Sequence, residues 1–274
     1  MKLELKFVLV NFNNSLLTID AIKSIYNIKG IGSPFVIIVD NNSKVEDYEI
    51  LCNFISESNY GAVLLKLNDN VGYFKAINEG LKKMYSIGID MRDVVVGNND
   101  VKFSDTFYEF YSDKISELSK YPVISPNIIT LDGVHQNPHV ISGISSFRKF
   151  VYKLYFSSYY LSVLINIVAY ITASFTKRKD TMLHKKSGAV LQGYGAMYIL
   201  TKKFFDHFEY LLAPVFLMGE EYFISHQVYS NGMKIFYEPS LIVYHREHAS
   251  VGKLYTKKMW KITRNSYYIY KDYL

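Results

Sequence analysis

The fold of this chain is decided by the segment FVIIVDNNS, residues 35–43. Its first five residues are apolar and mostly β-branched, which is typical of a strand buried on both faces of a parallel sheet. Its last four residues are polar and turn-forming. The segment therefore predicts a buried strand that opens into a polar loop at its carboxyl end.

The same pattern occurs three more times in the first hundred residues. Runs at 7–10, 62–67 and 93–96 each end in a loop rich in Asn and Asp, and helical periodicity separates the strands at 16–26, 45–56 and 73–86. Strands that alternate with helices predict an α/β fold with a mainly parallel central sheet flanked by helices. Ligands bind beyond the carboxyl ends of such strands, so the four loops together predict a binding site. Turn formation and helix capping compete as the explanation for any single loop.

Two phosphate-binding motifs are missing from the sequence. No G-x-G-x-x-G follows the first predicted strand, and no G-x-x-x-x-G-K-[ST] occurs anywhere. This argues against a Rossmann dehydrogenase and a P-loop NTPase. A nucleotide at this site would be held by side chains rather than by a glycine-rich loop.

The composition fits a globular protein of 274 residues, with one large domain or two small ones. Hydrophobic residues make up 49% of the chain and charged residues 20%, which excludes an intrinsically disordered chain. The single cysteine, Cys52, excludes an intramolecular disulfide framework and a zinc finger. Because no basic segment followed by an apolar run opens the sequence, no signal peptide is expected, and the predicted location is the cytoplasm.

The net charge of +6 is unevenly distributed. Residues 148–186 carry eight Lys and Arg and one Asp, and residues 246–274 carry seven Lys and Arg and two acids. The remainder of the chain is therefore net negative. Basic segments of this kind bind phosphate groups on a nucleic acid, a membrane surface or a nucleotide ligand.

An uncharged stretch, Leu154–Thr176, lies inside the first basic segment. It is long enough for a transmembrane helix, but polar residues dilute it, and Ser158, Ser162 and Asn166 form a narrow polar stripe at helical spacing. Basic residues flank it on both sides, which fits a helix lying in a membrane interface better than one crossing the bilayer. A buried helix, or a helical pair covering the sheet, explains the stretch equally well, and both interpretations stay open.

Three short motifs carry groups suited to catalysis. Asn98-Asn99-Asp100 follows the fourth predicted strand, and a carboxylate beside carboxamides can hold a divalent cation that clamps a diphosphate. Glu220-Glu221 precedes a helical pattern, where one acid can act as a general base, although the helix dipole alone also favours acids there. His245 ends a strand-like run and is a competent metal ligand, although a lone histidine there is more often a turn residue.

In this order, the motifs resemble those of a family 2 glycosyltransferase with the GT-A fold, and most closely its rhamnosyltransferase-like branch. The segment 39–43 is similar to the family's V-D-N-x-S, the segment 70–80 to its N-x-G-x-x-x-x-x-N-x-G, and the tripeptide 98–100 to its D-x-D metal motif, with Asn98 in place of the first aspartate. QGYGAM at 192–197, the pair 220–221, His245 and the dipeptide 264–265 match later motifs. The resemblance runs from Val8 to about Tyr270.

The resemblance implies a role for each motif. Glu221 corresponds to the catalytic base, with Glu220 beside it, and Asp100 and His245 would bind Mg²⁺ or Mn²⁺. The residues implied to bind the donor, a nucleoside-diphosphate sugar, are Asn11, Asn13, Asp40, Asn70, Gly72, Lys75, Asn98, Asn99 and Arg264.

The implied activity is that of an inverting, metal-dependent hexosyl- or deoxyhexosyltransferase in surface polysaccharide synthesis, with a saccharide or lipid-linked saccharide as acceptor. Residues 1–245 would form the catalytic domain, with a helical insertion at about 148–186. The basic, aromatic tail 246–274 would close over the donor site, with Lys253 assisting Arg264. The expected location is cytoplasmic, at the inner face of the cell membrane if 154–176 makes peripheral membrane contact. Nucleic acid is not expected as a partner.

Other classes of protein remain as alternatives. A nucleotidyltransferase of the same fold class favours a glycine-rich N-terminal loop that carries Lys or Arg, unlike residues 11–15. A non-catalytic membrane- or nucleic-acid-binding protein would use the basic segments and would not need Asp100, Glu221 and His245 together. A degenerate glycosyltransferase is disfavoured because Asp100 is present.

Overall fold

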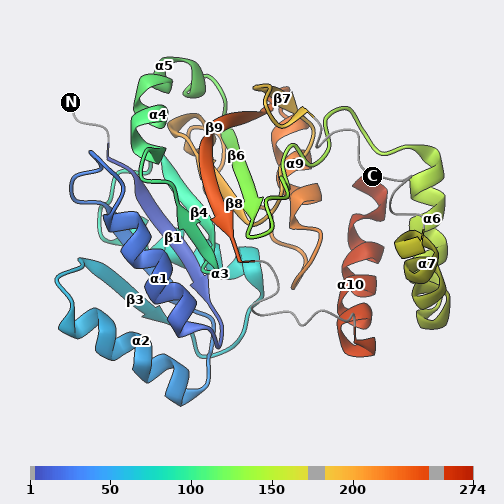
Figure 1. The fold of residues 1–274 in the computed structure, drawn as a ribbon, viewed down its shortest axis with the longest axis horizontal. Helices are drawn as coiled ribbons and strands as arrows, with labels where there is room; N and C mark the ends of the chain where they lie inside the picture. The colour runs from blue at the N-terminus through green and yellow to red at the C-terminus, as the bar shows by residue number, and fades with distance from the viewer. Residues whose placement is uncertain (1–3, 172–182, 247–255, 274) are drawn as a thin grey trace.

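The computed structural model describes residues 4–171, 183–246 and 256–273 (Figure 1). Nine strands form one sheet in the order β3-β2-β1-β4-β8-β6-β9-β5, and β7 pairs with β9. The strands are β1 (Lys6–Asn11), β2 (Phe35–Asp40), β3 (Ala62–Lys66), β4 (Val94–Asn98), β5 (Val101–Phe103), β6 (Val123–Thr130), β7 (Gly188–Val190), β8 (Met197–Leu200) and β9 (Ile235–His245).

The four predicted N-terminal strands are confirmed. β3, β2, β1 and β4 are neighbours and pair in parallel, with Asn11 opposite Asp40 at the carboxyl ends of β1 and β2. The later half of the sheet is mixed, because β8 runs antiparallel to β4 and β6, whereas β6 and β9 are parallel. The loops that follow β1, β2 and β4 therefore meet along one edge.

Helices cover both faces of the sheet, as the sequence predicts. They are α1 (Ser15–Tyr26), α2 (Val45–Glu57), α3 (Tyr73–Ser86), α4 (Phe107–Asp113), α5 (Ile115–Leu118), α6 (Ser146–Ser157), α7 (Tyr159–Ile171), α8 (Lys202–Phe205), α9 (Glu220–Tyr229) and α10 (Lys257–Tyr270), with a 3-10 turn at Lys271–Tyr273. Side chains alternate along β1, so that Phe7 and Leu9 pack with α1, α2, α4 and α5, whereas Val8 and Val10 pack with α3, α8 and α9.

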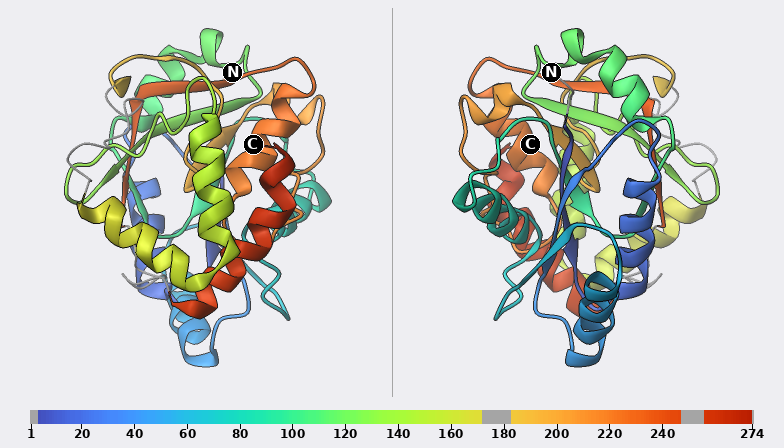
Figure 2. Two further views of the ribbon diagram at one scale, coloured as in Figure 1. Left: turned by 90° about the vertical axis from the view of Figure 1, so that its right-hand side faces the viewer. Right: turned by 90° about the vertical axis from the view of Figure 1, so that its left-hand side faces the viewer.

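Three of the helices, α6, α7 and α10, form a separate unit beside the sheet (Figures 1 and 2). The Phe156 ring of α6 stacks on Tyr267 of α10 with centroids 4.4 Å apart, and Trp260 Nε1 donates to the Tyr155 carbonyl at 3.3 Å. Tyr270 of α10 stacks on Tyr222 of α9 at 4.2 Å, which joins this three-helix unit to the rest of the fold.

The uncharged stretch is not one continuous helix. Ser158 has extended backbone angles, φ −146° and ψ 140°, and separates α6 from α7. No helix within the described residues is long and apolar enough to span a membrane. The end of the stretch, 172–176, and the predicted donor contact Lys253 lie outside the described residues.

Candidate functional site

A buried polar network joins the carboxyl ends of β1, β2 and β4. Asn11 Nδ2 donates to Asp40 Oδ1 at 2.9 Å, and Asn99 Nδ2 donates to Asn11 Oδ1 at 3.0 Å. Thr18 Oγ1 donates to the same Asn11 oxygen at 2.8 Å. Each of these four side chains is less than 9% exposed, so the hydrogen bonds are shielded from water and hold the three loops together.

Asp40 lies inside this buried network. This side chain is 0% exposed, and its second oxygen accepts the Ser43 backbone N–H at 3.1 Å. Asn13 is exposed at the same edge, where its Oδ1 accepts the Lys44 backbone N–H at 2.8 Å. Asp40 and Asn11 are thus buried in hydrogen bonds that hold the loops at this edge, whereas Asn13 is exposed, and their predicted contacts with the donor stay predictions.

The segment after β3 closes against the loop after β2. Asn41 Nδ2 donates to Asn70 Oδ1 at 3.0 Å, and the Val71 backbone N–H donates to Asn41 Oδ1 at 3.0 Å. Gly72 has φ +91°, and a Cβ there would lie 2.3 Å from the Phe216 carbonyl oxygen, so only glycine fits. Lys75 is exposed on the first turn of α3, which starts directly after this glycine.

Asp100 and His245 are brought together by the pairing of β5 with β9. Val101 lies opposite His245 in that antiparallel ladder. Asp100 Oδ1 and His245 Nε2 are 3.2 Å apart, and both side chains are buried. Asn98 Nδ2 lies 3.5 Å from the same His245 nitrogen. Three residues predicted from two distant segments therefore meet at one point.

This pair suits a divalent cation. His245 Nδ1 lies 2.8 Å from Gln136 Oε1, which can only accept, so Nδ1 carries a proton, and in the neutral ring Nε2 is the nitrogen free to bind a metal. Asp100 Oδ1 is buried and has no hydrogen-bond partner. A carboxylate oxygen and a ring nitrogen that lie close together away from water form an arrangement that can bind a cation. Within the described residues, no three His, Cys, Asp or Glu side chains cluster to hold a metal, so a bound ligand would supply the remaining coordination.

Tyr73 lies within reach of the charges of both Glu220, at the start of α9, and Asp100. Its hydroxyl donates to the Gly195 carbonyl at 3.0 Å, and a Cβ at Gly195 would lie 3.8 Å from Glu221 Oε2. Desolvation raises the pKa of the Tyr73 phenol well above its usual value, and the negative charges of Glu220 and Asp100 add to the effect. Tyr73 is therefore a neutral donor between the two sets of acids.

The two acids differ in environment. Glu220 is 5% exposed, and burial, followed by the charge of Glu221, raises its pKa to about 8. Its Oε1 has no hydrogen-bond partner. Glu221 is half-buried and faces Gly195. At neutral pH Glu220 is protonated, so it cannot accept a proton there, and Glu221 is the acid suited to act as a base.

Arg264 lies elsewhere. Its Nε donates to the Phe156 carbonyl at 2.9 Å, and its guanidinium lies 4.8 Å from the centre of the Tyr268 ring. These contacts hold it inside the three-helix unit. Its predicted role at the donor diphosphate stays a prediction.

Two residues of the site were missed by the sequence patterns. Gln136 follows β6, and nothing in the sequence around it marks a metal-supporting role. For Tyr73 the available signal was its position inside the 70–80 motif.

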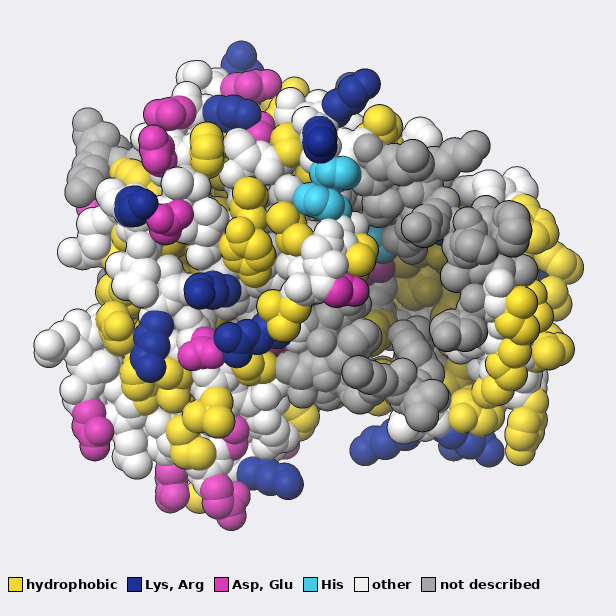
Figure 3. Space-filling view, viewed as in Figure 1, with side chains coloured by type: hydrophobic (Ala, Val, Ile, Leu, Met, Phe, Trp, Pro, Cys, Tyr) yellow, Lys and Arg dark blue, Asp and Glu magenta, His cyan; other side chains and the backbone are white. Residues whose placement is uncertain are grey.

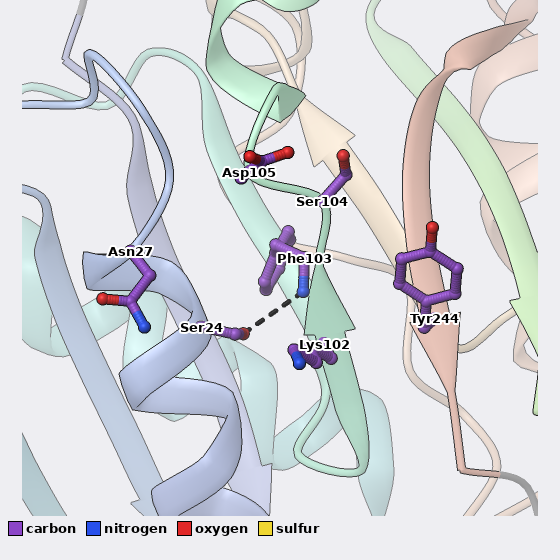
Figure 4. Close-up of a pocket in the computed structure, with 7 residues that line it drawn as sticks. All are labelled: Ser24, Asn27, Lys102, Phe103, Ser104, Asp105 and Tyr244. Atoms are coloured by element: carbon purple, nitrogen blue, oxygen red, sulfur yellow. Dashed lines mark hydrogen bonds between the residues drawn. The ribbon is translucent and has the colours of Figure 1, made fainter.

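A separate pocket of about 330 Å³ lies between α1 and the β5–β9 ladder (Figure 4). Lys102 and Tyr244 are cross-strand neighbours there. Side chains alternate along a strand, so Tyr244 and His245 point to opposite faces, and this pocket faces away from the Asp100–His245 pair.

No protein-family model matches the sequence, and no curated protein matches it. Solved structures do match the fold. The crystal structure of GalNAc-T7 with UDP, GalNAc and Mn²⁺ aligns with a TM-score of 0.62 at 13% identity, covering 97% of this chain and 48% of that chain. S. aureus TarS 1-349 in complex with UDP-GlcNAc aligns with a TM-score of 0.55 at 13% identity, covering 95% of this chain and 64% of that one.

These neighbours are GT-A glycosyltransferases, so the chain has the predicted GT-A type of α/β fold. It spans about half the length of the GalNAc-T7 chain and less than two thirds of the TarS 1-349 chain. At this level of identity the likeness is one of fold. The rhamnosyltransferase-like branch stays a prediction.

Proposed function

We propose that this protein is an inverting, metal-dependent glycosyltransferase that uses a nucleoside-diphosphate sugar. The observation that carries the proposal is the convergence of Asp100 Oδ1 and His245 Nε2, 3.2 Å apart and buried, beside the acids at the start of α9. The GalNAc-T7 neighbour was crystallised with UDP and Mn²⁺ and a TarS neighbour with UDP-GlcNAc, which supports the choice of donor and cofactor.

Asp100 and His245 are the residues that would hold Mg²⁺ or Mn²⁺. When bound there, the cation offsets the negative charge that develops on the leaving diphosphate. Gln136 keeps the His245 tautomer with its lone pair on Nε2, and Asn98 lies beside that nitrogen.

Glu221 acts on the acceptor. Its carboxylate removes the proton from the attacking hydroxyl, that oxygen bonds to the anomeric carbon from the face opposite the diphosphate, and the bond from that carbon to the diphosphate oxygen breaks, which releases the nucleoside diphosphate and inverts the configuration. Glu220 stays protonated at neutral pH and limits the negative charge next to the base. Asn13, Asn70, Gly72 and Lys75 line the donor side of the same edge.

Nucleotide-sugar turnover by matched variants tests the proposal. Wild-type protein with Mn²⁺ should release nucleoside diphosphate from a panel of nucleotide sugars, and Asp100→Ala should lose this activity. Glu221→Gln should lower transfer by a factor on the order of 10² to 10⁴, the usual contribution of a general base. Near-normal transfer by Glu221→Gln combined with loss in Glu220→Gln would show that the base is Glu220.

A binding assay tests the donor class without turnover. Nucleoside diphosphates and nucleotide sugars, with Mn²⁺ present, should raise the melting temperature, because a ligand that binds only the folded state stabilises it. If none of them shifts the melting temperature, the proposal fails. The convergence of Asp100, His245 and Glu221 argues against a non-catalytic binding protein, which has no need of it.

The acceptor is proposed to be a saccharide or a lipid-linked saccharide of a surface polysaccharide, and the enzyme to belong to the rhamnosyltransferase-like branch. The basic segments identified in the sequence support a phosphate-bearing partner. Transfer of radiolabelled sugar into an organic-solvent-extractable product would identify a lipid-linked acceptor.

A further inference from the structure

The outer face of α7 carries an apolar stripe whose side chains are exposed. Its six residues recur at intervals of three and four, so that they share one side of the helix. Their exposed fractions run from 39% to 76%, and they are Tyr160, Val163, Leu164, Ile167, Val168 and Ile171. We call this set the α7 stripe.

Of the two polar residues Ser162 and Asn166 of α7, Ser162 is turned inward, whereas Asn166 is exposed outside the stripe. Ser162 is 2% exposed, and its Oγ donates to the Tyr159 carbonyl at 2.6 Å. Asn166 Nδ2 donates to Tyr155 Oη of α6 at 3.5 Å. A surface helix in water normally buries its apolar side and exposes its polar one. α7 instead exposes its apolar stripe, which indicates that this face meets an apolar medium.

The charged residues on α6, α7 and α10 are of one sign. The sequences of α6, α7 and α10 contain no Asp or Glu. Lys257, at the start of α10, lies 6.0 Å from the centre of the Tyr159 ring, which places the basic end of α10 beside the first turn of α7. The Lys and Arg residues of the unit are Arg148, Lys149, Lys153, Lys257, Lys258, Lys261 and Arg264. Figure 3 shows hydrophobic side chains over α7 along the right-hand edge and Lys and Arg side chains below them.

We infer that the three-helix unit docks on an anionic phospholipid surface, with the α7 stripe in the interface and the lysines of α10 on the headgroup phosphates. α7 has 13 residues and is therefore about 20 Å long, too short to span a bilayer but sufficient to lie in its surface. Apolar side chains combined with basic residues are what an interfacial helix requires.

The basic charge of the three-helix unit favours an anionic lipid surface over a second copy of the chain as the partner. Two units facing each other through α7 would bring two sets of basic residues together, with no acid on these helices to offset the repulsion. Anionic headgroups supply that opposite charge. The docking surface does not include Asp100 or Glu221, so lipid binding can be tested independently of the proposed enzymatic activity.

Sedimentation of the full chain with vesicles tests the inference. Phosphatidylglycerol vesicles should bind the protein, and neutral phosphatidylcholine vesicles should bind it at least tenfold more weakly. Leu164→Glu/Ile167→Glu should abolish binding, because both side chains are exposed and the change places two charges in the stripe without disturbing the core. Its matched control is Ile50→Glu, an exposed apolar residue of α2 that should leave binding unchanged.

A second variant separates the charge from the stripe. Each Lys near an anionic surface is worth about a fivefold change in partitioning. Lys257→Glu/Lys258→Glu should therefore weaken binding at low salt by at least about twentyfold, and Lys23→Glu on α1 should not. Vesicle binding that survives the Leu164→Glu/Ile167→Glu change overturns the inference. Absence of vesicle binding by the wild type overturns it too, and a dimer that this double variant makes monomeric would assign the stripe to self-association.

Discussion

The buried carboxyl of Glu220 should make the stability of the protein fall as the pH rises. In the unfolded chain this group ionises near pH 4.5, whereas in the folded protein it ionises at about pH 8. Between these values the folded state holds a proton that the unfolded state has released, so the free energy of unfolding decreases with increasing pH. The loss begins above pH 4.5 and is complete above pH 8.

The size of the effect follows from the shift. One pKa unit corresponds to about 1.4 kcal/mol, so a rise from 4.5 to about 8 makes ionising Glu220 in the folded protein cost about 5 kcal/mol, of which on the order of 4 kcal/mol appears between pH 5 and pH 9. Glu220→Gln keeps the size and polarity of the side chain but has no proton to lose. The stability difference between wild type and Glu220→Gln should therefore change by this amount between pH 5 and pH 9, in the direction that disfavours the wild type at pH 9.

Urea denaturation followed by circular dichroism at several pH values measures this difference. Glu49→Gln, which changes an exposed carboxyl of α2, is the control and should show no comparable dependence. Parallel pH profiles for wild type and Glu220→Gln would refute the reasoning, because they would mean that Glu220 is already ionised in the folded protein at neutral pH.

Three further changes test other parts of the structure. Asn11→Ala removes the donor that pairs with Asp40 in a buried network, and should lower the free energy of unfolding by about 1–3 kcal/mol in urea denaturation. Gly80→Ala should cost about 1–3 kcal/mol despite the better helix propensity of alanine, because a Cβ there would lie 2.4 Å from Val8 Cγ1; unchanged stability would contradict that packing. Mn²⁺ should bind much more tightly in the presence of a nucleoside diphosphate than alone, by titration calorimetry, and Asp100→Asn should remove this difference.

The parallel half of the sheet was predictable because its information is local. Each strand is an apolar run bounded by turn-forming residues; β1, β2 and β4 are buried along almost their whole length, whereas the edge strand β3 is only partly buried. The spacing of the apolar residues and the ends of each run are visible in the sequence without knowing which strand pairs with which. The same reasoning predicted that the loops after these strands lie together, because the carboxyl ends of parallel strands meet at one edge of the sheet.

The meeting of Asp100 and His245 was not predictable from local pattern. Asp100 and His245 meet only because β5 and β9 pair, and neither segment encodes that choice of partner. The resemblance to a family supplied the link, and it carried no information about Gln136. Likewise, the sequence left open which of the two adjacent acids is suited to act as a base. Adjacent residues on a helix face different surroundings, and the difference in burial between Glu220 and Glu221 becomes visible only in the structure.

The uncharged stretch shows a different limit. Periodicity identified a polar stripe that includes Ser162 and Asn166, but it could not say which side of the helix meets a neighbour. The break at Ser158 and the position of α6 decide that, and both depend on tertiary packing.

The place of β9 in the sheet has a consequence for how the chain matures. β9 is the last strand in the described chain, yet it lies between β6 and β5. During synthesis, β1 to β4 can pair as soon as they emerge, whereas β5 must wait for a partner made much later. A nascent or prematurely ended chain therefore has an unpaired strand edge and no His245, and is exposed to aggregation. The Asp100–His245 pair thus assembles in the same step that completes the sheet, so an incomplete chain lacks it.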